Sequence, residues 1–99
     1  MIREIAALTI DPANAGAFED AVGQAQSIFL AAEGCRAMHL ERVIETPGSY
    51  RLVVEWETIE HHTEIFRNSE AFQAWRALAA PYFTVLPVVV HTDTVQWID

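Results

Sequence analysis

The chain has 99 residues, 52% of them hydrophobic, and a formal net charge of −8. This length predicts one domain spanning residues 1–99. Six arginines, no lysine and 14 carboxylates exclude the cationic surface that nucleic acid or an anionic membrane requires. No apolar run reaches the roughly 20 residues that span a bilayer. A single cysteine, Cys35, forms no internal disulfide and is typical of the cytoplasm.

The first half of the chain predicts a strand, a helix and a strand. Residues 2–10 are the first strand, and Asp11 then caps a helix whose first position is Pro12. Gly34 ends this helix, and residues 35–46 form the second strand. Apolar residues three and four apart give the helix one buried face, made of Phe18, Val22, Ala25, Phe29 and Ala32.

The second half predicts a strand, a helical region and a final strand. A turn at residues 47–49 precedes a strand over 50–57, whose alternation places Tyr50, Leu52, Val54 and Trp56 on one face. Thr58 and Ser69 are expected to cap two helical segments, and residues 87–98 form the last strand.

This order predicts an α+β, ferredoxin-like β-α-β-β-α-β fold, with a four-stranded antiparallel sheet and helices on one face. The other sheet face is expected to be half apolar and to pack against a second copy, giving a homodimer. The residues expected on that face are Ile5, Val43, Val53 and Val95, among Glu41, Arg51, Glu55 and Asp93.

The adjacent His61 and His62 raise the question of a metal or catalytic site. Helical spacing places His62 on the buried face with Ile59 and Phe66, and turns His61 by about 100° toward solvent. Adjacent helix residues do not face a common point, and H-E-x-x-H is absent, so we expect no metal site. His62 is either a general base or a core histidine bonded to a carbonyl.

Aromatic residues suggest either a core or a ligand cavity between helix and sheet. Phe72, Trp75 and Tyr82 recur at helical spacing, and a small core rarely holds them together with Trp56 and Phe66. Arg76 could serve an anionic substrate or pair with a surface carboxylate. His91 in the last strand could point into the cavity or into a dimer interface.

Three segments resemble the antibiotic biosynthesis monooxygenase domain: EGC at 33–35, YRLVVEWET at 50–58 and FRNSEAFQAWRALAAPYF at 66–83. The resemblance implies a dimeric α+β barrel made by two ferredoxin-like subunits, each with a pocket between helices and sheet. Characterised members of the family oxidise polycyclic aromatic phenols to quinones with molecular oxygen and no cofactor. Other members degrade haem or isomerise small signalling sugars.

The haem-degrading branch has three features that this sequence lacks. It needs an asparagine in the first strand, where this chain reads IREIAALTI. Ile65 and Phe66 stand where that branch has a tryptophan, and Trp75 and Arg76 occupy the region of its iron-ligating histidine. The sugar-isomerising branch would have a histidine near Phe66. We therefore expect no haem and no other cofactor.

Two functional hypotheses follow. In the first, the protein is a cofactor-independent monooxygenase acting on a small electron-rich phenol, with His62 as base and Arg76 or Tyr82 as anion partner. In the second, it is a non-catalytic dimeric module that binds a small molecule or assists another protein. The expected substrate contacts are Trp56, Phe66, Phe72, Trp75 and His91.

Overall fold

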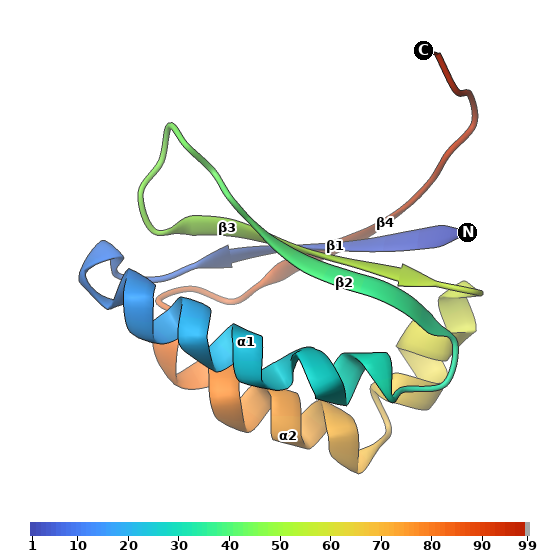
Figure 1. Ribbon diagram of the computed structural model, residues 1–99, viewed down its shortest axis with the longest axis horizontal. Coiled ribbons are helices and arrows are strands. Elements are labelled where there is room, and N and C mark those ends of the chain that lie inside the picture. Colours follow the sequence, from blue (N-terminus) through green and yellow to red (C-terminus); the bar gives the residue numbers. More distant parts are fainter. Residues whose placement is uncertain (99) are drawn as a thin grey trace.

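The computed structural model describes residues 1–98 and is a four-stranded antiparallel sheet with helices α1 and α2 packed on one face (Figure 1). The strand order is β2-β3-β1-β4, so the predicted ferredoxin-like fold is confirmed. The strands are β1 (Ile2–Thr9), β2 (Cys35–Arg42), β3 (Ser49–Trp56) and β4 (Val88–Asp93). The helical elements are α1 (Ala15–Leu30), α2 (Glu70–Ala79), the π-helix η2 (His61–Phe66), and the 3₁₀ turns η1 (Pro12–Asn14) and η3 (Ala80–Tyr82).

Strand β1 lies in the middle of the sheet and pairs antiparallel with β3 and β4. Residues paired across strands share a face, so the register decides which side chains meet under the helices. Glu4 is paired with Val54 of β3 and with His91 of β4. The predicted alternation of β3 is confirmed, because Tyr50, Leu52, Val54 and Trp56 are all buried on the helix side.

Helix α1 is shorter than predicted at its start. The Asp11 side chain accepts a hydrogen bond from the Ala13 amide at 2.9 Å, but the turn that it caps is the 3₁₀ turn η1. The predicted apolar face is confirmed for Phe18, Val22, Ala25 and Phe29, which are buried. Ala32, predicted on the same face, lies beyond the end of α1 at Leu30 and is only partly buried. None of the helices within residues 1–98 is long and apolar enough to cross a bilayer.

Helix α2 begins where the sequence predicts. The Ser69 hydroxyl accepts from the Phe72 amide at 3.3 Å, which satisfies one of the free donors of the first turn. Pro81 lies in the 3₁₀ turn that follows Ala79, as expected for a residue that cannot continue an α-helix. The face of α2 that meets the core carries Trp75 and Ala79.

The last strand ends five residues earlier than predicted. Asp93 pairs with Ile2, the first residue of β1, so no neighbouring strand remains beyond this point. Residues 94–98 lie outside the sheet and extend away from the helices (Figure 1). Their apolar side chains are exposed, at 95% for Val95 and 86% for Trp97.

The open face of the sheet also differs from prediction. Ile5, Val53 and Val90 lie together on it, because Ile5 pairs with both valines. Asp93, expected on the same face, shares the helix side with Ile2 instead. Val43 and Val95 lie outside the strands, because β2 ends at Arg42 and β4 at Asp93.

The helical turn after β3 is wider than an α-helix. The Arg67 amide donates to the His62 carbonyl five residues earlier, at 3.1 Å, which is the π-helical pattern. His62 and Phe66, four residues apart, are therefore both buried, at 2% and 3% exposure. Ile59, predicted to share their face, is 38% exposed because the wider turn changes the phase.

The prediction that His61 faces solvent is wrong. Its imidazole lies against Gly34, where an added Cβ would come within 2.3 Å of the ring. Nδ1 shares a 2.7 Å hydrogen bond with the Thr58 hydroxyl, and Nε2 lies 3.5 Å from a Glu33 oxygen. Gly34 also has a φ of 81°, which favours glycine at this turn. His61 thus packs against the turn between α1 and β2 and connects it to the start of η2.

Candidate functional site

A cavity of about 380 Å³ lies between the sheet and helix α2. Its walls are mainly apolar, and its polar groups are one carboxyl, one imidazole and two guanidinium groups. This combination is typical of small-molecule sites, in which a few polar groups orient a ligand inside an apolar enclosure. The lining residues are Glu4, Ala6, Leu8, Leu52, His62, Arg67, Phe72, Trp75, Arg76, Phe83, Leu86, Pro87 and Val89.

Glu4 is a buried carboxyl group in the middle strand of the sheet, with only 5% of its surface exposed. The Trp56 indole N–H donates to its Oε1 at 3.0 Å, and His62 Nε2 lies 3.3 Å from the same oxygen. Oε2 has no hydrogen-bond partner among residues 1–98. Every polar side-chain atom of residues 1–98 that is completely shielded from solvent has a hydrogen-bond partner. Because Oε2 has no partner, it is not completely shielded.

His62 lies between Glu4 and His91. Its Nδ1 is 2.8 Å from His91 Nε2, while its Nε2 faces Glu4, so both ring nitrogens have partners. The imidazole stacks on Trp56 with ring centroids 5.6 Å apart and an angle of 19° between the planes. The four side chains come from β1, β3, η2 and β4, and they form one connected polar network.

Burial sets the protonation states of this network. It raises the pKa of Glu4 to about 7, although the Trp56 hydrogen bond and the charge of Arg67 oppose this shift. Burial lowers the pKa of His62 to about 4, and the positive charges of Arg67 and His91 act in the same direction. The pKa of His91 is lowered by burial and by Arg67. Near neutral pH both histidines are uncharged, and Glu4 is close to its midpoint.

Two arginines supply the positive charge of the cavity. Arg67 directly follows η2, and Arg76 lies on α2 next to Trp75. The Arg76 guanidinium lies 6.0 Å from the centre of the Phe72 ring, within the range of a cation–π contact. Both arginines are exposed, so they can approach an anionic group at the cavity without being buried themselves.

The structure brings most of the predicted site residues together. His62, Phe72, Trp75 and Arg76 line the cavity. Trp56 and His91 do not line it, but they bond to Glu4 and His62, which do.

Two predicted site residues lie elsewhere. Phe66 packs between Trp56 and Phe29, with ring centroids 5.4 Å and 4.9 Å away. Tyr82 meets the edge of Phe18 at 5.8 Å. Neither residue is among those that line the cavity.

Glu4 and Arg67 were missed by the sequence analysis. The signal for Glu4 was present, since Ile2, Glu4, Ala6 and Leu8 alternate through the first strand and only one of them is charged. A carboxylate at a core position of a strand indicates a paired or functional group. The signal for Arg67 was weak, because an arginine after a helical turn is usually solvated.

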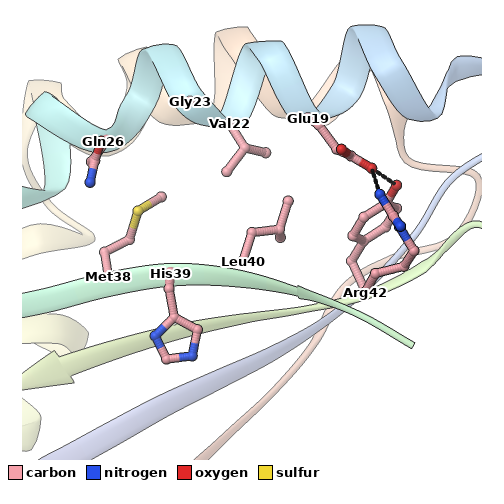
Figure 2. A pocket seen from close by; sticks show the side chains of 9 residues that line it. Glu19, Val22, Gly23, Gln26, Met38, His39, Leu40 and Arg42 are labelled. Atoms are coloured by element: carbon pink, nitrogen blue, oxygen red, sulfur yellow. Dashed lines mark hydrogen bonds and ion pairs between the residues drawn. The ribbon is translucent and has the colours of Figure 1, made fainter. Parts of the chain in front are cut away.

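A second cavity of about 370 Å³ lies between α1 and β2. Figure 2 shows Val22, Met38 and Leu40 pointing into it and His39 pointing away. Its carboxylate, Glu19, accepts from the Tyr50 hydroxyl at 2.6 Å and from Arg42 at 3.0 Å. The Tyr50 hydrogen bond and then the Arg42 bond lower the pKa of Glu19, so this cavity offers an already paired carboxylate rather than a reactive one.

The histidines do not converge on a metal position. Within residues 1–98, no group of three or more histidine, cysteine, aspartate or glutamate side chains is arranged to hold a metal ion. His61 bonds to Thr58, whereas His62 bonds to His91. His61 and His62 thus take part in two separate contacts on different sides of η2.

The family model for the antibiotic biosynthesis monooxygenases matches residues 1–78. The chain belongs to this family. The uncharacterised protein YczJ of Bacillus subtilis (strain 168) is 41% identical over 95 residues, which cover 96% of this chain and all of that protein. The match thus covers nearly the whole length of both proteins.

Solved structures of antibiotic biosynthesis monooxygenases have the same fold. A Bordetella bronchiseptica protein assigned to the family is 42% identical, with a TM-score of 0.93 over 96% of this chain and 97% of that one. SnoaB, a cofactor-independent oxygenase from Streptomyces nogalater, is 16% identical, with a TM-score of 0.75 over 98% of this chain and 95% of that one. At that identity the likeness to SnoaB is one of fold.

The two buried titrating groups predict opposite pH dependences of stability. The folded-state pKa of Glu4 is raised from 4.5 to about 7, so its contribution to stability is complete below pH 4.5 and is lost as the pH rises to 7. The folded-state pKa of His62 is lowered from 6.5 to about 4, so its contribution is complete above pH 6.5 and is lost as the pH falls to 4. Each slope reaches at most about 1.4 kcal/mol per pH unit.

A variant that lacks one of these groups should keep only the pH dependence of the unfolding free energy that the other group causes. Relative to the wild type, the unfolding free energy of Glu4→Gln should rise with pH between 4.5 and 7, and that of His62→Gln should fall between 4 and 6.5. Urea unfolding at half-unit pH steps measures both differences. Variant curves that run parallel to the wild type across this range would show that neither group titrates as described.

Proposed function

We propose that this protein is a cofactor-independent monooxygenase that oxidises a small, electron-rich phenol with molecular oxygen. The observation that carries the proposal is the Glu4–His62 pair in the wall of the cavity of about 380 Å³, facing Phe72 and Trp75. An acid–base pair inside an apolar enclosure is suited to removing a phenol proton while it keeps bulk water away from the phenolate. Membership of the family, and the cofactor-independent activity named for SnoaB, support the same reading.

The chemistry needs only a base, an anion partner and oxygen. Loss of the phenol proton gives a phenolate, which passes one electron to O₂. The resulting radical and superoxide combine to form a carbon–oxygen bond as a peroxide. Removal of the remaining hydrogen at that carbon, with loss of hydroxide, leaves a carbonyl group. One oxygen atom of O₂ enters the quinone and the other leaves as water.

The cavity residues take distinct roles in this scheme. Phe72 and Trp75 hold the aromatic ring of the substrate, and the Glu4–His62 pair accepts its proton. Arg76 stabilises the phenolate, and Arg67 adds a second positive charge at the same cavity. The half-buried free thiol of Cys35 is compatible with a reducing compartment, so we propose that the reaction takes place in the cytoplasm.

Filling the cavity should stop the reaction. Val89 lines the cavity from β4, and Val89→Phe would place a ring in the space that the substrate needs. We expect wild-type protein to consume oxygen with at least one member of a panel of hydroquinones and anthrones, and Val89→Phe to do so at least about tenfold more slowly. An oxygen electrode gives both rates.

Ile44→Phe is the matched control, because Ile44 is 86% exposed in the loop after β2 and does not line the cavity. It should oxidise the substrate at the wild-type rate. A wild-type protein that binds these phenols without consuming oxygen would favour a non-catalytic binding module. Equal rates in Val89→Phe and the wild type would place the reaction elsewhere.

A second copy of the chain is the proposed partner, packed on the face of the sheet opposite the helices. Val88 and Val90 on that face are 64% and 51% exposed, and they adjoin Ile5. The extended segment 94–98 leaves Trp97 86% exposed, which is unusual for a large apolar side chain in a monomer. Burying these residues against a symmetry-related copy would remove them from water.

Light scattering on the purified protein tests this assembly. The wild type should have twice the 11.1 kDa mass of the chain, and Val90→Arg should lower the dimer population, because two charges would be buried near the interface. Ile65→Arg, at a 45% exposed position on the helical side, is the control and should leave the mass unchanged. A wild type with the mass of one chain would exclude the dimer.

A further inference from the structure

We propose that Glu4, rather than His62, is the group that takes the proton from the phenol, and that His62 and His91 are residues that position it. This inference rests on the proposed function and refines its central step. It assigns the base to a residue that sequence reasoning did not select. It also implies that the hydrogen bonds among Glu4, Trp56, His62 and His91 all lead toward Glu4 as the final acceptor.

Both ring nitrogens of His62 are already occupied by neighbouring side chains. Nδ1 is 2.8 Å from His91 Nε2, and Nε2 is 3.3 Å from Glu4 Oε1. A general base needs a free lone pair aimed at the proton that it accepts. His62 would have to break one of these two contacts, at a position with only 2% exposure, before it could accept a proton from a ligand.

The two oxygens of the Glu4 carboxyl have different surroundings. Oε1 accepts from the Trp56 indole N–H at 3.0 Å, and His62 Nε2 lies 3.3 Å from the same oxygen. Oε2 has no partner among the described residues and is not fully enclosed, while Glu4 itself lines the cavity. Oε2 is therefore the oxygen of this network with a lone pair available to a ligand.

The order of donors and acceptors in the network also leads to Glu4. An indole N–H can only donate, which makes Oε1 an acceptor. Of the two neutral tautomers of His62, the one with its proton on Nε2 turns that proton toward Oε1. In this tautomer Nδ1 is an acceptor, and His91 donates to it through Nε2. The chain of donors then runs from His91 through His62 to Glu4. His91 fixes the tautomer of His62, and His62 fixes the orientation of the carboxylate.

The surrounding charges are compatible with this assignment. Arg67 is the cation whose charge favours the ionised form of Glu4, against the effect of burial. Burial lowers the pKa values of His62 and His91, and the charge of Arg67 adds to this effect, so both rings are neutral as the donor chain requires. The balance leaves the Glu4 carboxyl near its midpoint at neutral pH, where a general base is most effective.

Protons balance through Glu4 alone. The phenol O–H bond breaks and its proton moves to Oε2, leaving a phenolate beside the arginines. Glu4 returns this proton to the peroxide oxygen after O₂ has added. The carboxylate then takes the hydrogen from the same carbon as hydroxide leaves, and gives it to the hydroxide to form water. The carboxyl ends in the state in which it began.

The probe for this step is 3-nitrophenol, which is largely neutral in water at pH 7 and becomes yellow on ionisation. Wild-type protein should bind it partly as the phenolate, and Glu4→Gln should lower the bound phenolate fraction by about tenfold or more. His62→Gln and His91→Leu should retain the phenolate but shift the pH at which it forms. Glu45→Gln is the charge-matched control at an exposed position in the loop after β2 and should behave as the wild type.

Loss of the phenolate in His62→Gln, with its retention in Glu4→Gln, would overturn the assignment in favour of His62. Wild-type protein that binds the probe only in its neutral form, or does not bind it at millimolar concentration, would overturn it as well. None of these measurements involves oxygen. Phenolate formation without oxygen consumption would therefore reject the proposed oxidation and keep Glu4 as the proton acceptor.

A measurement on the wild type alone covers the case in which Glu4→Gln does not fold. At pH 8 the infrared difference spectrum should gain the carbonyl band of a neutral carboxylic acid when 3-nitrophenol binds, because Oε2 receives the proton. A spectrum that changes only in its imidazole bands would assign the proton to a histidine and contradict the proposal.

Discussion

The site depends on one buried carboxyl group. Glu4 lies in the middle strand of the sheet, where a carboxylate without partners would be strongly destabilising. The fold stabilises it with the Trp56 indole from the next strand and the His62 ring from the turn above. Removing Trp56 should leave Oε1 without its hydrogen-bond donor, so we expect Trp56 to be constrained by Glu4 as much as by packing.

Much of the fold could be predicted from the sequence because its signals are local. The alternation of β3, the apolar face of α1 and the Ser69 cap depend only on near neighbours in the chain, and all three are confirmed. The failures have a different origin. The register that ends β4 at Asp93 depends on where β1 begins, and the contact of His61 with Gly34 depends on a turn far away in the sequence.

The candidate site could be predicted only in part, for the same reason. Helical spacing placed His62 on the buried side, although the π-helical turn rather than an α-helix puts it there. Its partners come from positions 4 and 91, which only the sheet register brings together. No local pattern relates a glutamate near the start of the chain to a histidine near its end. The alternation of β1 nevertheless marked Glu4 as a charge on a core face.

The adjacent His61 and His62 have separate functions in this account. His61 is a structural residue that holds the turn before β2, and His62 belongs to the hydrogen-bond network at the cavity. The cavity combines apolar walls, a carboxyl near its midpoint and two cations, which together suit an acidic aromatic molecule. Family membership and the shared fold are what the comparisons add, and oxidation of such a molecule is the proposal made above.

The most direct test of the account is a titration of Glu4 in the ligand-free protein by ¹³C NMR of its side-chain carboxyl. The account predicts a midpoint of about 7, with the Trp56 indole N–H resonance shifting at the same pH because it donates to the titrating group. A midpoint near the ordinary value of 4.5, or an indole resonance that does not follow the carboxyl, would contradict it.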